Sequence, residues 1–310
     1  MEQKKSHKSL WLWLGIGGGV FLLFFGAIFW MAWMIGGSNS DDDGFRAFSG
    51  GSIAVVDIDG VILSAEDTEN DLHKFADDDS VKAIILHVNS PGGGAAASQE
   101  IYHEVLEIRE KKKKPVVVSI ESVGASGAYY IASAANKIYA NDASVVGSIG
   151  VIAEWVNYGE LMKWAKLKQV TFKAGDLKEA GTPTRDPTPA EAAYLQSLID
   201  NMHQQFIDDV AKGRNMPEKN IETIASGRVW TGQQALPMHL IDKVGTFRDC
   251  LMDTAASVGI KGEPNIVRPV KPRRGLLDVV AGDTDLSLLN PAKMVSKAME
   301  ENPGFYFLWK

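Results

Sequence analysis

Ser126 is the residue of this 310-residue chain best placed to act as a nucleophile. It stands among small residues, in Gly124-Ala-Ser-Gly-Ala128, shortly after the apolar run at 116–120. A serine nucleophile needs a base to take its proton and hydrogen-bond donors to hold the oxyanion that forms. Free N–H groups at the start of a helix that follows a strand can supply those donors. Small residues at a helix start also serve close packing, so the stretch alone leaves both interpretations open.

A second glycine-rich stretch, Asn89-Ser-Pro-Gly-Gly-Gly94, follows the apolar run at 83–88. Gly and Pro at this density predict a turn, and the turn is no P-loop because no Gly-Lys-Ser/Thr sequence follows it. If the two glycine-rich turns end neighbouring parallel strands, they face one another across a cleft. A carbonyl group bound between them would meet a nucleophile and two sets of backbone donors.

The base that would take the proton of Ser126 is harder to identify from the residues alone. None of the six histidines stands in a recognisable catalytic setting; they are His7, His73, His87, His103, His203 and His239. The Pro- and Gly-punctuated segment at 172–189 carries Lys173 and Lys178. A free lysine has a pKa near 10.4, so a lysine base near neutral pH needs burial that lowers its pKa by roughly 3. Composition does not choose between the two lysines.

The elements that must position these residues follow a repeated order along the chain. Apolar runs predict strands, helical periodicity predicts helices, and an N-cap role for Thr188 is expected at the longest helix. Strands are expected at 53–59, 83–88, 116–120, 137–140 and 143–152, turns at 89–94 and 121–125, and helices at 95–111, 126–135, 189–213 and within 227–245. Strand–turn–helix units in succession indicate an α/β fold with a parallel sheet.

The N-terminal part of the chain predicts a membrane anchor. Residues 10–36 are almost wholly apolar, with tryptophans near both ends, and about 20 such residues span a bilayer core. Lysines precede the run and aspartates follow it, which places the N-terminus in the cytoplasm and the rest of the chain outside the plasma or inner membrane. A cleaved signal peptide is the alternative, but its apolar core would be only about 7–15 residues long.

Composition excludes several other classes of protein. The net charge of −7 gives no sign of nucleic-acid binding, which requires a clustered basic face. The single cysteine, Cys250, excludes a disulfide within the chain and a metal site made of several cysteines. We expect a cytoplasmic N-terminus at 1–9, the anchor at 10–36, a linker at 37–50, a catalytic domain at 51–266 and a C-terminal tail at 267–310.

Taken in order, these stretches resemble the signal peptide peptidase A family of membrane-anchored serine proteases. The resemblance covers most of residues 53–250 and rests on the following motifs: Asn89-Ser-Pro-Gly-Gly93, Lys114-Pro-Val-Val-Val118, Ala125-Ser-Gly-Ala-Tyr-Tyr-Ile-Ala132, Gly147-Ser-Ile-Gly-Val151, Lys173-Ala-Gly-Asp-Leu-Lys-Glu-Ala-Gly181 and Gly227-Arg-Val-Trp-Thr-Gly-Gln-Gln-Ala235. Each motif alone is weak, but the ordered set is specific. No internal duplication appears, so the chain resembles the short form of the family, with one site.

The resemblance implies a Clp protease/crotonase-like fold and a serine–lysine dyad. It matches Ser126 to the nucleophile and Lys178 to the general base. It matches the backbone N–H groups of Gly93 and Gly127 to the oxyanion donors. We add the hypothesis that the hydroxyl of Ser148 hydrogen-bonds the neutral Lys178 amine; a simple turn serine at a strand end is the alternative.

The resemblance also implies what this protein would act on and assemble with. Its substrates would be remnant signal peptides and similar apolar peptides, bound in extended form as an added strand. The chain would form a homo-oligomeric ring and would need no metal or organic cofactor. The apolar run at 305–309 would dock in a groove of its own or a neighbouring subunit as a self-inhibiting peptide, or pack on the domain surface.

The chain departs from the family pattern at Ala128, His87 and the stretch Pro237-Met-His239, and the roles of His87 and His239 are open. Three other classes of function are alternatives. An α/β-hydrolase esterase would use Gly124-Ala-Ser-Gly-Ala128 as a nucleophile elbow, but Lys178 would then have no role. A catalytically inactive membrane scaffold would not need an intact dyad. A crotonase-like acyl-CoA enzyme would not need a nucleophile at the helix start.

Overall fold

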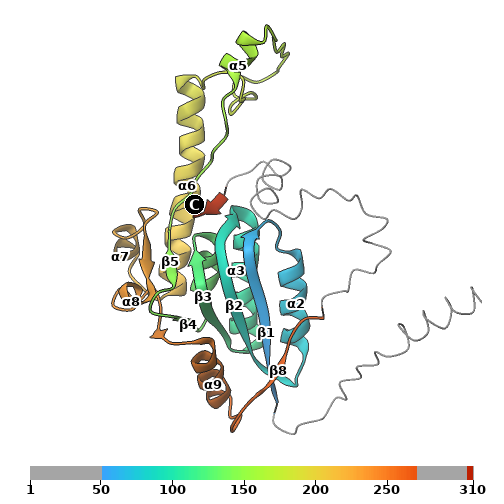
Figure 1. Cartoon of the computed structure of the whole chain (residues 1–310), viewed down its shortest axis with the longest axis vertical. Helices are drawn as coiled ribbons and strands as arrows, with labels where there is room; N and C mark the ends of the chain where they lie inside the picture. Colours follow the sequence, from blue (N-terminus) through green and yellow to red (C-terminus); the bar gives the residue numbers. More distant parts are fainter. Residues whose placement is uncertain (1–50, 271–305, 310) are drawn as a thin grey trace, which may run out of the picture. The chain divides into compact units, whose positions relative to one another are not determined.

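The computed structural model describes residues 51–270 and 306–309 of the chain. The described strands form one nine-stranded sheet (Figure 1). They are β1 (Ser52–Ile62), β2 (Val81–Gly94), β3 (Val116–Ala125), β4 (Lys137–Ala140), β5 (Val145–Gly147), β6 (Val229–Thr231), β7 (Lys243–Val244), β8 (Asn265–Val267) and β9 (Tyr306–Leu308). The main path runs β6-β5-β3-β2-β1-β8, β4 pairs with β3 and β7, and β9 pairs with β2.

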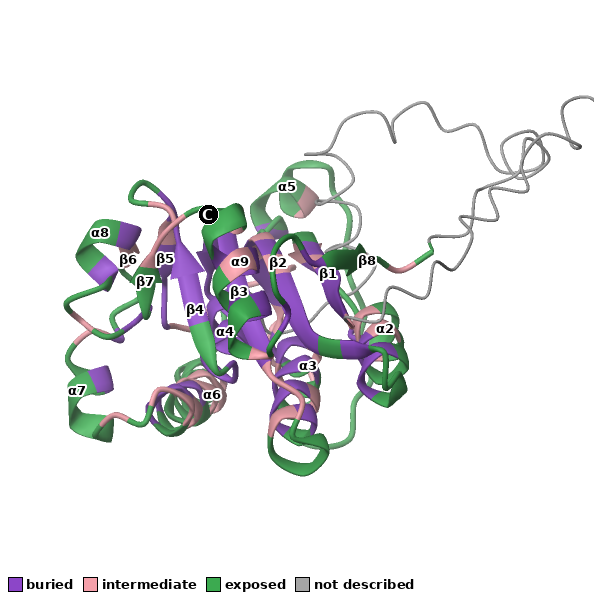
Figure 2. Cartoon of the chain, turned by 90° about the horizontal axis from the view of Figure 1, so that it is seen from below, coloured by how far each residue is buried: buried purple, intermediate pink, exposed green. Residues whose placement is uncertain are grey.

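The strand pairs are parallel except β5–β6 and β2–β9. This arrangement confirms the predicted parallel α/β sheet. The central strands read as continuous apolar runs, such as Ile84-Ile85-Leu86, because helices cover both faces. Figure 2 shows these central strands as the most buried part of the described chain.

The described helices are α2 (Glu66–Asp77), α3 (Ala95–Glu107), α4 (Gly127–Ser133), α5 (Gly159–Trp164), α6 (Pro189–Gly213), α7 (Glu218–Glu222), α8 (Gly232–Ala235) and α9 (Phe247–Ser257), and a π-helical turn, η1 (Ile108–Lys112), extends α3. Helices α2, α3, α4 and α6 contribute to the larger core on one face of the sheet. Helix α9 covers the other face, where Cys250 and Leu251 pack with Ile53 and Ile85. Alternate residues of β1 therefore enter different cores, as the period of two in a strand requires.

The glycine-rich stretches at 89–94 and 121–125 are strands, so the turns predicted there are wrong. Register shifts after Asp59 and after Val88 let β1 and β2 bend and continue beyond their apolar runs. Strand β1 passes through Gly60, whose φ of 69° suits glycine, and its last residue pairs with Gly93. The strand expected at 143–152 is shorter than predicted, because the positive φ of Ser148 ends β5 at Gly147.

The helices expected at 95–111 and 189–213 are confirmed, and the helix expected at 126–135 is α4. Thr188 caps α6 as predicted, in a capping box with Glu191. The last predicted helix is the four-residue α8. Helices α2, α5, α7 and α9 were not predicted; in α2 the many acidic residues obscure a short buried stripe of Leu72, Phe75 and Ala76.

Helix α6 extends beyond the sheet, and its N-terminal half lies beside the segment that carries α5 (Figure 1). We call residues 153–188, which lead from the sheet to α6, the arm. The arm exposes large apolar side chains, including Trp164 at 82% and Phe172 at 96% exposure. In soluble proteins, large exposed apolar patches mark interaction sites.

The described residues contain no helix that is both long and apolar enough to cross a bilayer. The predicted anchor at 10–36 and the linker at 37–50 lie outside the described residues. The same holds for most of the predicted tail at 267–310.

Candidate active site

Ser126 occupies a sharp turn between β3 and α4. Its φ of 53° and ψ of −119° are an uncommon backbone conformation for a residue with a side chain. Its N–H donates to the carbonyl of Gly147 at 2.7 Å, and its carbonyl accepts from the N–H of Tyr130 at 2.8 Å. The residue is 1% exposed. The turn therefore fixes the serine at the N-terminal end of a buried helix.

Helix α4 is anchored by two buried tyrosines. Tyr129 donates to the carbonyl of Leu240 at 2.8 Å, and Tyr130 donates to the carboxylate of Asp209 on α6. Burial raises the pKa of both phenols above the ordinary value, so both remain protonated donors. These bonds hold the serine turn rigidly against the rest of the fold.

Gly93 and Gly127 lie at the same end of two neighbouring parallel strands. The register pairs Ser90 of β2 with Gly124 of β3, and each glycine follows three residues later. A Cβ atom at Gly93 would lie 2.0 Å from the carbonyl oxygen of Ile62, so only glycine fits there. The first N–H groups of α4 have no acceptor inside the helix. Two sources of backbone donors thus lie close to Ser126.

Ser148 lies on the other side of Ser126. Ala125 of β3 pairs with Gly147 of β5, which brings the two following serines to adjacent strand ends. Ser148 also has a φ of 53°, and its N–H donates to the carbonyl of Arg228 at 2.9 Å. Four of the five predicted site residues are therefore gathered at one edge of the sheet.

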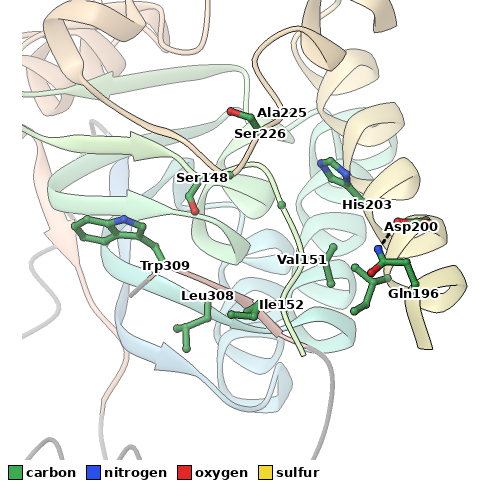
Figure 3. Close-up of a pocket in the computed structure, with 13 residues that line it drawn as sticks. Ser148, Val151, Ile152, Gln196, Asp200, His203, Ala225, Ser226, Leu308 and Trp309 are labelled. Carbon is green, nitrogen blue, oxygen red and sulfur yellow. Dashed lines mark hydrogen bonds between the residues drawn. The ribbon is translucent and has the colours of Figure 1, made fainter. Parts of the chain in front are cut away.

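A pocket of 480 Å³ opens beside Ser148 (Figure 3). Its walls come from the chain after β5, from α6, from the segment before β6 and from the C-terminus; the lining residues drawn with labels are Ser148, Val151, Ile152, Gln196, Asp200, His203, Ala225, Ser226, Leu308 and Trp309. Helix α6 supplies a polar wall in which Gln196 donates to Asp200 at 2.7 Å. The Nε2 atom of His203 is buried without a hydrogen-bond partner among the described residues. The α6 wall was not predicted, because nothing in the helix pattern marks these residues.

The C-terminal strand β9 occupies the edge of the sheet at the glycine-rich end of β2. It runs antiparallel to β2 and pairs with Gly92, Gly93 and Gly94. The N–H of Trp309 then donates to the carbonyl of Pro91 at 2.8 Å. An extended peptide thus adds to the sheet at the predicted oxyanion glycine, in a groove of its own chain.

Lys178 is not part of this arrangement within one chain. Its side chain is exposed on the arm, and no hydrogen bond joins it to Ser126 within the described ranges. The arm is tied to α6 at Glu191, whereas His203, further along the same helix, lines the pocket. With a helical rise of about 1.5 Å per residue, these two positions lie about 18 Å apart along the helix axis. A single copy of the chain therefore separates the predicted base from the predicted nucleophile.

His87 and His239 lie outside the pocket lining. His87 Nδ1 lies 3.3 Å from Asp57, and its ring packs edge-on against Phe247 of α9. Partial burial acts to raise the pKa of Asp57, but Arg268, at 2.6 Å, and His87 together hold this pKa below its ordinary value. His239 supplies its carbonyl to Arg214. Neither position suggests a catalytic role. Among the described residues, no group of three or more His, Cys, Asp or Glu side chains could hold a metal ion.

Comparison with known proteins relates this chain to a family of peptidases. The family model for peptidase family S49 matches residues 108–261, which include Ser126, Ser148 and Lys178. A Synechocystis protein named as a candidate protease is 33% identical over 251 residues, covering 79% of this chain and 88% of the relative. The chain belongs to peptidase family S49. This membership confirms the resemblance to signal peptide peptidase A.

Other S49 relatives match a smaller share of their own length. A candidate protease of Methanocaldococcus jannaschii is 38% identical over 207 residues, which cover 67% of this chain and 65% of the relative. A candidate signal peptide peptidase of Enterococcus faecium is 37% identical over 180 residues, covering 58% of this chain and 52% of the relative. A solved structure of a membrane-bound stomatin-specific protease mutant aligns with a TM-score of 0.46 at 15% identity, over 72% of this chain and 99% of that one.

Proposed function

We propose that this S49 peptidase is a membrane-anchored serine endopeptidase that uses a Ser126–Lys178 dyad to degrade remnant signal peptides and similar apolar peptides. The observation that carries the proposal is the set of groups gathered at the end of β3, beside Ser126. A serine with an uncommon backbone conformation at a helix start, the strand position Gly93 that admits only glycine, and a docked peptide strand meet there. These are the parts that acyl transfer to a serine needs, apart from the base.

The mechanism assigns one step to each group. Neutral Lys178 takes the proton of the Ser126 hydroxyl, and the resulting alkoxide attacks the carbonyl carbon of the scissile peptide bond. The N–H groups of Gly93 and Gly127 stabilise the oxyanion. Protonated Lys178 then gives its proton to the leaving amine, and water hydrolyses the acyl-enzyme by the same route. The hydroxyl of Ser148 hydrogen-bonds the neutral Lys178 amine and orients it.

Substrates bind as β9 does, by adding an antiparallel strand at Gly92–Gly94. Backbone hydrogen bonds give the affinity, and side chains that enter the adjoining pocket give the specificity. The pocket combines apolar residues such as Val151 and Ile152 with the polar wall of α6. The chain's own tail competes with substrate for this edge.

The dyad is completed between copies of the chain in a homo-oligomeric ring. Lys178 is exposed on the arm, and the arm also exposes Trp164 and Phe172, which a neighbouring copy would cover. The Lys178 of one copy then meets the Ser126 of the next.

The wider architecture is a Clp protease/crotonase-like domain behind a membrane anchor at residues 10–36. The N-terminus lies in the cytoplasm and the catalytic domain outside the plasma or inner membrane. The anchor holds the groove near the bilayer, where cleaved signal peptides remain. Neither a metal, an organic cofactor nor a nucleic acid takes part.

Defined signal peptides, incubated with the full-length protein and analysed by mass spectrometry, test the activity. Wild type is expected to give internal cleavage products, and Ser126→Ala and Lys178→Ala none. Mixing the two inactive variants in detergent before the assay is expected to restore cleavage, because a mixed ring pairs an intact serine with an intact lysine of the neighbour. Full activity of Lys178→Ala would contradict the dyad. Two inactive variants that stay inactive after mixing would contradict its assembly between copies.

A further inference from the structure

Four charged side chains, three from the arm and one from α6, hold the segment that carries Lys178 against the N-terminal end of α6. These are Lys173, Glu179, Arg185 and Glu191, which we call the arm clamp. Lys173 Nζ lies 3.1 Å from Glu179 Oε2, Arg185 Nη2 lies 3.3 Å from the same oxygen, and Arg185 Nη2 lies 2.7 Å from Glu191 Oε1. One continuous chain of ion pairs therefore joins the Lys178 segment to the long helix.

Glu191 is the fixed end of the arm clamp. It is 2% exposed, and its carboxylate accepts two parallel hydrogen bonds from Arg185 and one from the N–H of Thr188 at 2.8 Å. The Arg185 guanidinium and then the Thr188 N–H lower the pKa of Glu191 to about 2. The carboxylate thus stays ionised in the working range of pH, and a bidentate arginine pair fixes direction as well as distance.

Lys173 and Arg185 enclose the turn that contains Lys178. Lys173 Nζ donates to the carbonyl of Asp176 at 3.4 Å and to the carboxylate of Glu179, so it spans residues on both sides of Lys178. The N–H of Lys178 donates to the carbonyl of Gly175 at 3.2 Å. The backbone around Lys178 is therefore held from within the turn and from α6, although its side chain is exposed.

Within the arm clamp, Glu179 carries the carboxylate nearest to Lys178 in the sequence, and the two cations of the clamp pair with it. A carboxylate without a partner beside a lysine favours the ammonium form and makes that lysine a poor base. The charged groups that face the Glu179 carboxylate are Lys173 and Arg185, and both lower the pKa of Glu179. The Arg185 guanidinium in turn faces the carboxylates of Glu179 and Glu191. Two cations thus pair with the Glu179 carboxylate.

We propose that Lys173, Glu179, Arg185 and Glu191 are positioning residues for the catalytic lysine. They present Lys178 at a fixed place on the arm and keep Glu179 from pairing with it. The inference rests on the proposed function, in which Lys178 is the base. It goes beyond that function in assigning the arm clamp, and not only the groove, to the catalytic machinery.

The test compares Arg185→Ala, Arg185→Lys and Glu179→Gln in the full-length protein with Glu160→Gln. Glu160 forms a 2.7 Å ion pair with Lys163 on the same arm, and both side chains are highly exposed, so this variant is a matched control. kcat and KM for a signal peptide are measured from pH 6 to pH 10. Hydrogen exchange of residues 173–186 is measured on the same preparations.

Arg185→Ala is expected to lower kcat between about 10-fold and 100-fold while KM changes less than about twofold, because a misplaced base affects the chemical step. Glu179 then keeps only Lys173 as a partner, and its more weakly paired carboxylate is expected to move the acid limb of the kcat profile upward by up to about one pH unit. Glu179→Gln is expected to lower kcat without that upward movement, since no carboxylate remains. Arg185→Lys recovers part of the rate, and Glu160→Gln behaves as wild type. Faster exchange at 173–186 accompanies each loss.

Failure of this inference is distinct from failure of the dyad. If Lys178→Ala is inactive while Arg185→Ala and Glu179→Gln keep wild-type kcat, the dyad stands and the positioning role is wrong. If Lys178→Ala keeps full activity, both proposals are wrong. If Arg185→Ala fails to fold, Arg185→Lys and Glu179→Gln decide. A loss in Glu160→Gln equal to that in Glu179→Gln would also overturn the inference.

Discussion

Replacing Gly93 by alanine is expected to slow peptide hydrolysis at least about 10²-fold, whereas the same change at the next residue, Gly94, is expected to be tolerated. A Cβ at Gly93 would lie 2.0 Å from the carbonyl oxygen and 2.5 Å from the nitrogen of Ile62, both of them backbone atoms of β1. Real Cβ atoms essentially never come closer than 3.0 Å. The ends of β1 and β2 must therefore separate by at least about 1 Å in Gly93→Ala.

That displacement moves the N–H group expected to stabilise the oxyanion. Loss of one such donor lowers the rate by about 10²–10³-fold, or about 2.7–4 kcal/mol of transition-state stabilisation, and a 1 Å misplacement alone can lower it about 10²-fold. A Cβ at Gly94 would meet only ordinary contacts, at 3.6 Å from the Ile62 oxygen and 3.7 Å from the Ala97 Cβ. The φ of Gly94, −55°, also suits alanine.

The assay is kcat/KM for a defined signal peptide, with thermal unfolding of each variant as the control for folding. Gly93→Ala is expected to fall at least about 10²-fold and Gly94→Ala less than about threefold. Wild-type kcat/KM in Gly93→Ala would refute the assignment of this strand end to the oxyanion site. Equal losses in both variants would show that the end of β2 tolerates no side chain, whatever its position.

Three further predictions concern the tail, the acid stability and the support of α4. Deleting residues 305–310 is expected to raise kcat/KM for added peptide, because β9 covers the groove at Gly92–Gly94. A synthetic peptide of the tail sequence should then inhibit the shortened protein competitively, and unchanged kinetics would contradict this. The pKa of Glu191 falls from 4.5 in the unfolded chain to about 2 in the folded one, so its contribution to stability is complete above pH 4.5 and is lost as the pH falls towards 2. In Glu191→Gln the melting temperature, measured by calorimetry, should therefore depend less on pH between 4.5 and 2 than in wild type; the same pH dependence in both proteins would contradict this. Tyr129→Phe leaves the buried Leu240 carbonyl without its donor and should lower the free energy of unfolding in urea by about 1–3 kcal/mol, with no loss disproving the role of this bond.

The core of the fold was predictable because its signals are local. Buried parallel strands read as apolar runs, and the Thr188 cap with a proline in the first turn marks the start of α6. The glycine-rich stretches were predicted as turns and are strands instead, because their pairing partners are remote in the sequence. Ile62 pairs with Gly93, and Gly124 pairs with Ser90; no local pattern contains that information.

The site was predictable in part for the same reason. Ser126 and Gly93 stand in compact stretches whose residue types suggest their chemistry, and strand register then brings them together. The α6 wall at Gln196, Asp200 and His203 was not predictable, because polar residues on a half-exposed helix are ordinary. The docking of β9 depends on a contact across more than two hundred residues. The exposed position of Lys178 follows from tertiary structure alone.

The central claim is that Ser126 is a nucleophile activated by Lys178. Labelling of the folded, full-length protein with a fluorophosphonate at neutral pH, followed by peptide mass spectrometry, tests it most directly. We predict an adduct on Ser126 in wild type, none in Ser126→Ala, and labelling of Lys178→Ala that is slower by at least about 10²-fold, as expected for loss of a general base. An adduct on another residue, or wild-type labelling of Lys178→Ala, would contradict the account.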